Sequence, residues 1–221
     1  QVNQRASLAT SKSSKDKLLV DTKGQEVKYQ QLLTAAEREQ TAFFEELRKL
    51  ESQAVANGTV ITHVTASSVP KRGTKIFTYP YSDYILTQGF GMTSYAKKGA
   101  YGGAPHNGID IVSGIGSPIH SIGEGEILAG GFNNGYGNWI SVKHDNGMVS
   151  VYAHMRNSSG LKNGTRVNAQ SVIGYEGSTG NSTGSHLHLS LYRDFFTYIS
   201  TKNGQLYFNY FDGTVNPLDY L

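Results

Sequence analysis

The sequence predicts a mainly β protein, in which an antiparallel β-sheet domain follows a helical segment. From residue 76 onward, short runs of alternating polar and apolar residues are separated by Gly and Asn-Gly, as in NWISVKHDNGMVSVYAH. Regular short strands with such turn signals favour an all-β sandwich or barrel. Residues 1–57 contain one of the 26 glycines, no proline, and many Lys, Glu, Gln and Ala residues, which favour a helix. We therefore expect a helical segment (1–57), a linker (58–75) and a β domain (76–221).

The helical segment carries an apolar seam whose members are three or four residues apart, which is typical of a coiled coil. They are Tyr29, Leu33, Ala36, Phe43, Leu47, Leu50 and Ala54, with Gln40 as a polar member. Asn57-Gly58 is a stop signal for the helix. Because one helix with such a stripe is not stable alone in water, it needs a partner: another copy, the start of the chain folded back, or the β domain. Alternatively, it is simply a surface helix of that domain. Removing residues 1–57 is expected to leave a folded domain.

The predicted linker has room for one short strand, whereas the β domain is rich in turn signals. Asn146-Gly147, between two alternating runs, is the strongest hairpin signal. Further turn signals occur at Asn134-Gly135, Asn163-Gly164 and Asn203-Gly204.

Composition excludes several classes of protein. The net charge of +3 is too small to indicate a nucleic-acid partner. The chain has no cysteine, which excludes disulfides and thiolate metal ligands. No stretch approaches the roughly 18 apolar residues of a membrane span. The N-terminus lacks the apolar core of a signal peptide, so an exported form would have lost its signal or carried it outside this chain.

Four of the seven histidines fall in three short segments that together predict a zinc site. These segments are His106-Asn-Gly-Ile-Asp110, Tyr152-Ala-His154 and His186-Leu-His188. Two histidines, one aspartate and an open position are what a catalytic zinc ion needs.

Strand periodicity predicts which of these side chains share a face, because alternate residues of a strand point the same way. His186 and His188 are therefore expected on one face of their strand, together with Ser190. The same rule places His154 on one face with Ser150 and Tyr152, opposite Val149, Val151 and Ala153. Gly108, between His106 and Asp110, leaves space where a side chain would crowd a metal.

These motifs resemble those of the lysostaphin/LytM-type zinc metallopeptidases, which cut peptides in bacterial peptidoglycan. The family pattern is H-x-G-x-D, then a Y-x-H strand, then a Gly/Ser/Thr-rich loop that ends in H-L-H. This chain has all three in order, the last as GSTGNSTGSHLH. The segments YGNWISVKHDNGMVSVYAHM, SVIGYEGSTG and VNPLDYL also match, so the resemblance covers roughly residues 76–221. It implies an antiparallel β-sheet domain of the duplicated hybrid motif type, with a groove over the sheet.

Carried over residue by residue, the resemblance implies that His106, Asp110 and His188 bind one zinc ion. It also implies that His154 and His186 are an unligated catalytic pair. Three protein ligands leave the fourth position of zinc for a water, whose pKa the metal lowers to about 7. A neutral histidine beside it can take a proton, and a protonated one can stabilise an oxyanion. The sequence leaves these two roles open between His154 and His186.

Three further residues are candidate contacts with the substrate or transition state. Tyr101 precedes His106 and could place its hydroxyl near the developing oxyanion, as family members have a tyrosine nearby. Asn107 and Asn181 are candidate groove contacts. His144, beside the Asn146-Gly147 turn, is expected to be solvated. The chain departs from the family at Ser185, where proline is common.

The resemblance implies a peptidoglycan endopeptidase, and therefore an extracytoplasmic protein of the cell envelope, periplasmic or secreted. The alternative is a non-enzymatic regulator, because some LytM-like proteins with coiled coils have lost zinc ligands and activate amidases. A peptidoglycan-binding module without turnover is a third class. No ligand or catalytic histidine is missing here, which favours the enzyme. The coiled coil would then serve self-association or docking on a membrane complex.

Overall fold

The computed structural model describes the backbone of residues 2–221, and side chains from residue 21 onward except those at 33, 36, 37 and 40. The chain divides into two compact units, residues 1–40 and 41–221. Helix α1 (Val2–Ala56) makes up the first unit and continues into the second. This division lies inside the helix, whereas the sequence suggested a boundary at its end.

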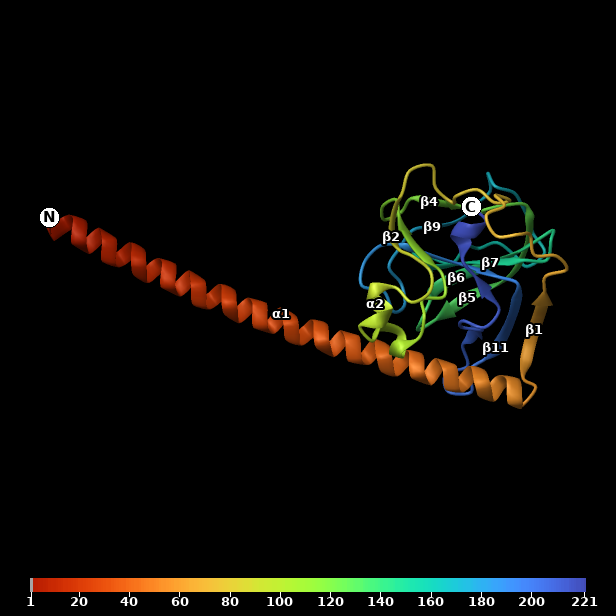
Figure 1. Cartoon of the computed structure of the whole chain (residues 1–221), viewed down its shortest axis with the longest axis horizontal. Coiled ribbons are helices and arrows are strands. Elements are labelled where there is room, and N and C mark those ends of the chain that lie inside the picture. The colour runs from red at the N-terminus through yellow and green to blue at the C-terminus, as the bar shows by residue number, and fades with distance from the viewer. Residues whose placement is uncertain (1) are drawn as a thin grey trace. The chain divides into compact units, whose positions relative to one another are not determined.

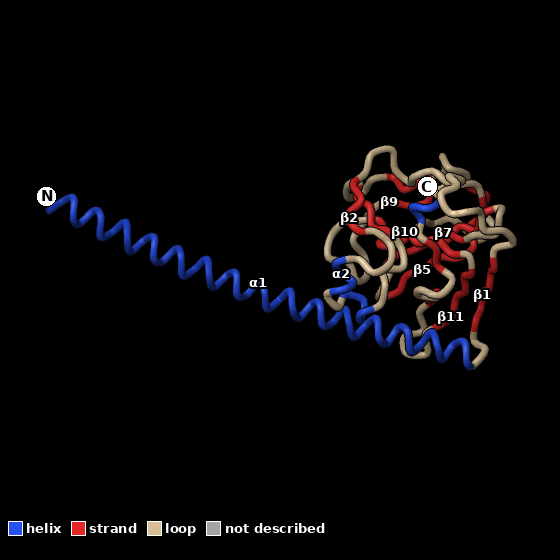
Figure 2. Tube along the Cα trace, in the orientation of Figure 1, coloured by secondary structure: helices blue, strands red, loops and turns tan. Residues whose placement is uncertain are grey.

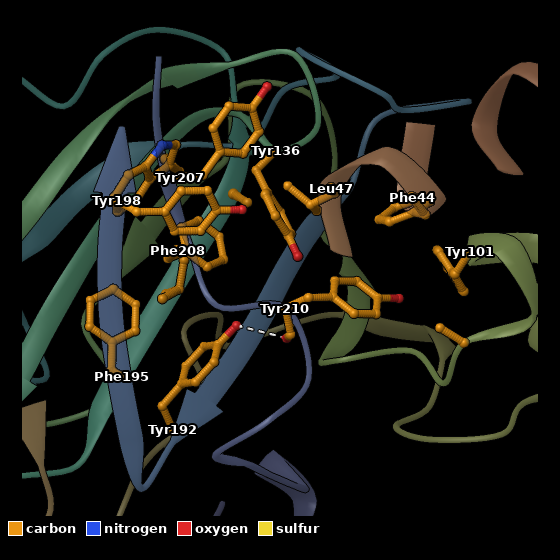
Figure 3. Close-up of a cluster of buried hydrophobic side chains, with 14 of the residues drawn as sticks. Phe44, Leu47, Tyr101, Tyr136, Tyr192, Phe195, Tyr198, Tyr207, Phe208 and Tyr210 are labelled. Carbon is orange, nitrogen blue, oxygen red and sulfur yellow. Dashed lines mark hydrogen bonds between the residues drawn. The ribbon is translucent and has the colours of Figure 1, made fainter. Parts of the chain in front are cut away.

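The C-terminal part of α1 belongs to the second unit because its apolar side chains are buried there. Leu47 is 1% exposed, and Phe44 and Ala54 are also buried, in one cluster with aromatic residues of the β domain. Figure 3 shows Phe44 and Leu47 on the helix beside Tyr210, and the rings of Phe44 and Tyr210 lie 5.3 Å apart. For this part of the seam, the partner is therefore the β domain.

The coiled coil itself stays a prediction. Of the seam residues, Leu33, Ala36 and Gln40 lie outside the residues whose side chains are described, and Tyr29 is exposed. Within the described part of the chain, no helix has both the length and the apolar character needed to cross a membrane.

The rest of the second unit is built from antiparallel sheets, which confirms the predicted mainly β, antiparallel class (Figures 1 and 2). The main sheet has the order β2-β3-β10-β7-β6-β5-β8, with β13 also paired to β10. Its strands are β2 (Ile85–Gln88), β3 (Ile109–Val112), β5 (Gly125–Asn133), β6 (Gly137–His144), β7 (Val149–Met155), β8 (Arg166–Val167), β10 (Leu187–Tyr192) and β13 (Thr214–Val215).

Two smaller sheets and three short helices complete the fold. One sheet joins β1 (Val60–Thr65), β11 (Asp194–Ile199) and β12 (Leu206–Phe208), and the other joins β4 (Pro118–His120) and β9 (Val172–Tyr175). The helices are α2 (Ser94–Lys97), η1 (Ala100–Gly103) and η2 (Pro217–Asp219). Strand β1 lies within the segment expected to be a linker and pairs with β11.

The main sheet separates two apolar clusters, and the alternation of β10 shows how. Leu187, Leu189 and Leu191 lie in one cluster, and Tyr192 lies in the other. His188 and Ser190 share the face of Tyr192 because alternate residues point the same way. The predicted Asn146-Gly147 turn joins β6 to β7, with Gly147 in the left-handed region at φ 83°. Glycine adopts this conformation without steric cost.

His144 is buried rather than solvated, which corrects the expectation from the adjacent turn. Its side chain is 2% exposed. The Nδ1 atom lies 2.9 Å from the Glu124 carbonyl oxygen, and Nε2 lies 2.8 Å from Ser150 Oγ. Ser150 in turn donates to the Tyr152 hydroxyl at 3.0 Å. This network occupies the interior on the Tyr152 side of the sheet, so His144 has a structural role.

We expect His144 to make folding stability depend on pH. Burial lowers the pKa of His144 from 6.5 to about 4, although the hydrogen bond to Glu124 opposes the shift. Below pH 6.5, His144 becomes protonated in the unfolded chain but stays neutral in the folded chain. The free energy of unfolding therefore falls as the pH drops towards 4. At about 1.36 kcal/mol per pKa unit, the loss is roughly 3 kcal/mol. In urea unfolding across this pH range, the free energy of unfolding should fall less steeply for His144→Gln than for the wild type. An equal pH dependence in the two proteins would contradict the role of His144.

Candidate metal centre and active site

Three side chains bring their ligand atoms together at one point on the main sheet. His106 Nε2 lies 3.0 Å from His188 Nδ1 and 3.2 Å from Asp110 Oδ1. His188 Nδ1 lies 2.9 Å from the same carboxylate oxygen. Ligand atoms around a tetrahedral zinc ion, with bonds near 2.0 Å, are about 3.3 Å apart. Among the described residues, these three form the group that could hold a metal ion.

Strand pairing creates this convergence. Asp110 on β3 lies directly opposite His188 on β10 in the antiparallel register. His106 precedes β3, and its backbone is bridged to Gly91. A Cβ atom on Gly108 would lie 2.5 Å from the Leu189 carbonyl oxygen and 2.8 Å from the His188 ring. Glycine is therefore needed at this position so that the His188 imidazole can reach Asp110.

Neighbouring groups orient the two ligand imidazoles. His106 Nδ1 lies 2.8 Å from the Gly89 carbonyl oxygen. Since a carbonyl can only accept, Nδ1 carries the proton and Nε2 directs a lone pair into the cluster. His188 Nε2 lies 2.8 Å from Ser190 Oγ, which leaves Nδ1 for the cluster. Metal-bound histidines in proteins are held by such outer partners.

The charges in the cluster also suit a metal ion. Burial would raise the pKa of Asp110, but His106 and His188 lower it well below its usual value, so the carboxylate is ionised. Burial lowers the pKa of His188 to about 4, against the opposing effect of Asp110. The imidazole is therefore neutral near neutral pH. Neutral imidazoles and an ionised carboxylate are the forms in which these residues ligate metals.

His154 reaches the site by a route that simple strand alternation does not give. The β10–β7 register places Ala153 opposite His188 and Tyr152 opposite Leu189, so Tyr152 points to the other face. His154, two residues beyond Tyr152, would follow it if alternation held. Instead His154 has φ 59°, next to a register irregularity between β6 and β7. This corrects the prediction that Ser150, Tyr152 and His154 share a face.

This irregularity places His154 beside His186, next to the candidate metal-ligand cluster of His106, Asp110 and His188. The two rings are 4.6 Å apart, and His186 Nε2 lies 3.8 Å from Asp110 Oδ1. Each Nδ1 lies 2.8 Å from a backbone carbonyl oxygen, that of Thr179 for His154 and that of Gly184 for His186. Because each carbonyl accepts a hydrogen bond from an Nδ1–H group, the Nε2 atom of each ring carries the lone pair and can take a proton. Burial, with His186 and His188, lowers the pKa of His154 to about 3.

Tyr101 lies against the back of His106. The two rings stack at 5.2 Å, and the Tyr101 hydroxyl accepts a hydrogen bond from Gln88 Nε2 at 2.7 Å. Burial and then Asp110 raise the pKa of Tyr101, so the hydroxyl keeps its proton. Its φ of 58° makes it, with His154, one of two non-glycine residues at positive φ among those described. Backbone strain of this kind gathers at functional sites.

The two asparagines differ in their surroundings. Asn107 is buried and donates from Nδ2 to the Tyr136 hydroxyl and the Tyr210 carbonyl, both at 2.8 Å. It therefore supports the His106 segment from inside, which corrects its expected role as a groove contact. Asn181 is half-buried, and its backbone N–H donates to the Gly135 carbonyl at 2.8 Å.

Residues that support the His106 segment belong to no sequence motif, so the sequence did not predict them. The Tyr210 hydroxyl donates to the Pro105 carbonyl at 2.9 Å, next to His106. Glu51 of α1 accepts a hydrogen bond from the Tyr210 N–H at 2.9 Å. The alternation of the H-L-H-L-S strand was the available signal for Ser190, but nothing in the sequence links Tyr210 or Glu51 to the site.

Comparison with known proteins places this arrangement in a family. The model of peptidase family M23 matches residues 104–205. The DD-carboxypeptidase/endopeptidase Mpg of Neisseria meningitidis serogroup B is 41% identical over 83 residues, which are 38% of this chain and 19% of that protein. The glycyl-glycine endopeptidase ALE-1 of Staphylococcus capitis is 34% identical over 105 residues, which are 44% of this chain and 29% of that protein.

One solved structure is also similar to this chain. The catalytic domain of lysostaphin from Staphylococcus simulans is 28% identical, with 65% of this chain and 90% of that chain covered and a TM-score of 0.42. The chain spans less than a third of the length of the two curated relatives. The family match covers all three segments: His106 to Asp110, the Y-x-H strand and the H-L-H strand. Residues 104–205 of the chain therefore match the peptidase domain of family M23.

Proposed function

We propose that this protein is a zinc-dependent endopeptidase that hydrolyses peptide bonds in bacterial peptidoglycan. The observation that carries the proposal is the convergence of His106, Asp110 and His188 beside the unligated His154 and His186. The name of a further relative supplies the substrate class, because the peptidoglycan DD-endopeptidase ShyC of Vibrio cholerae serotype O1 is 36% identical over 83 residues.

Zinc is the metal that fits this donor set best. Two imidazole nitrogens and one carboxylate oxygen, in a protein without thiolate ligands, match a catalytic zinc site with one open position. When bound, zinc would polarise the substrate carbonyl and lower the pKa of a coordinated water.

The side chains of this protein would provide the remaining chemistry. His154 is neutral near neutral pH and has Nε2 free, so it can accept a proton from the attacking water. His186, with its own Nε2 directed towards Asp110, can orient the water or stabilise the developing oxyanion. Tyr101 holds His106 by stacking and retains a hydroxyl proton.

All three candidate ligands and both further histidines are present, which favours the enzyme over the non-enzymatic alternative, a regulator of amidases. Cleavage of peptidoglycan also implies an extracytoplasmic location, in the periplasm, the cell envelope or the medium. Self-association through the N-terminal part of α1 is a separate proposal from the sequence.

Digestion of purified peptidoglycan tests the function. We expect the zinc-loaded protein to release fragments with new amine ends, whose masses identify the bond as a stem-peptide cross-link or a glycyl bridge. Chelation should abolish release, and added zinc should restore it. If protein with one bound zinc per chain cleaves neither type of cross-linked peptidoglycan, a binding or regulatory protein would be favoured.

A further inference from the structure

We infer that Glu176 is a positioning residue for His186, acting through Ser185. The inference rests on the proposed peptidase function, in which His186 belongs to the catalytic pair. Glu176 lies outside the metal-ligand cluster, ten residues before His186 in the sequence. It lies within the segment SVIGYEGSTG, but nothing in that segment indicates a role for it.

Glu176 is a fully buried carboxylate whose described partners are all hydrogen-bond donors. Its side chain is 0% exposed. Oε2 accepts from the Ser113 N–H at 2.8 Å and from the Gly114 N–H at 3.2 Å. Oε1 accepts from Ser185 Oγ at 2.8 Å. A carboxylate accepts on both oxygens, and leaving such a group unpaired in the interior is costly.

These bonds connect two segments that supply the active site. Ser113 and Gly114 immediately follow β3, the strand that carries Asp110. Ser185 immediately precedes His186. The Glu176 carboxylate therefore connects the end of β3, which carries Asp110, to Ser185. The two side chains that it helps to position are close together, with Asp110 Oδ1 3.8 Å from His186 Nε2.

Thr179 and Asn181 attach the first part of the loop to β6, β7 and Gly135, whereas its last part, residues 182–185, has few other anchors. Ser182 is bonded to Ser178 and to the Gly184 carbonyl, and His186 Nδ1 is bonded to the same carbonyl. These bonds are internal to the loop, so they shape it without placing it on the sheet. The Gly177–His186 backbone bridge and the Glu176–Ser185 bond place the part of the loop that immediately precedes His186. The bridge fixes the chain at His186, and the Ser185 bond determines its direction just before the imidazole.

Ser185→Ala tests the inference, because it removes one hydroxyl and leaves the Ser113 and Gly114 bonds of Glu176 in place. We expect kcat to fall roughly 10–100-fold, as a misplaced catalytic group does, with little change in KM or in bound zinc. Ser185→Thr keeps a hydroxyl and should restore most of the kcat. Glu176→Gln should lower kcat at least as much, and its effect should not add to that of Ser185→Ala. Glu126→Gln, at a partly exposed surface ion pair, is the matched control.

Full activity in Ser185→Ala would overturn the inference, as would equal losses in the Thr and Ala variants. Additive losses in the Glu176→Gln, Ser185→Ala double variant would do so as well, because independent sites add. Failure of the proposed function would appear differently, as absence of cleavage by the wild type. In that case the ¹⁵N imidazole resonances of His186 still decide the inference: they should move in Ser185→Ala and stay in Ser185→Thr and Glu126→Gln.

Discussion

Asp110→Ala should lose both the bound metal and peptidoglycan cleavage, whereas His154→Ala should lose cleavage and keep the metal. Asp110 supplies an ionised oxygen within 3.2 Å of both ligand nitrogens, so its removal leaves two histidines and no compensating negative charge. His154 supplies no atom to the ligand group. Removal of a general acid or base costs about 10²–10⁴-fold in rate. The measurements are zinc content by elemental analysis and the rate of fragment release.

The pair of variants separates ligands from the residues that act beside them. His106→Ala should behave like Asp110→Ala. His63→Ala is the matched histidine control, because His63 lies on the surface, paired with Asp194, and should leave both quantities unchanged. Loss of zinc from folded His154→Ala would refute the division of roles between the two groups of histidines.

The fragment 41–221 should fold, and the fragment 58–221 should not. Residues 41–56 bury Phe44 and Leu47 in the same cluster as the single tryptophan, Trp139. Loss of one such side chain costs about 2–5 kcal/mol, and a domain has only about 5–15 kcal/mol in total. The structure thus leads us to expect the opposite of the sequence-based prediction that residues 1–57 are dispensable. Circular dichroism and Trp139 fluorescence would measure both fragments.

Two leucines on the same helix provide a matched test of this reasoning. Leu47 is 1% exposed and Leu32 is 63% exposed. Leu47→Ala should lower the free energy of unfolding of the β domain by about 2–5 kcal/mol, and Leu32→Ala by less than about 0.5 kcal/mol. Cooperative unfolding of fragment 58–221, with the same midpoint as fragment 41–221, would show that the helix contributes nothing to the core.

The sequence by itself determined the class of fold and predicted the residues of the candidate site. Alternation between apolar and polar residues predicts which segments are strands. The residue types of His106, Asp110 and His188 indicate donor atoms that suit a metal ion. Both are local properties, because side-chain direction along a strand and the chemistry of a ligand are set by neighbouring residues.

Only the tertiary structure decided the arrangement around that site. His154 faces the candidate metal site because of its positive φ, which strand alternation does not predict. His144 and Asn107 are buried in the folded protein. The tertiary structure also placed Glu51, Glu176 and part of α1 behind the segments of the candidate site. These contacts join residues far apart in the chain, and no local pattern encodes them. Their energies depend on which surfaces meet in the folded protein.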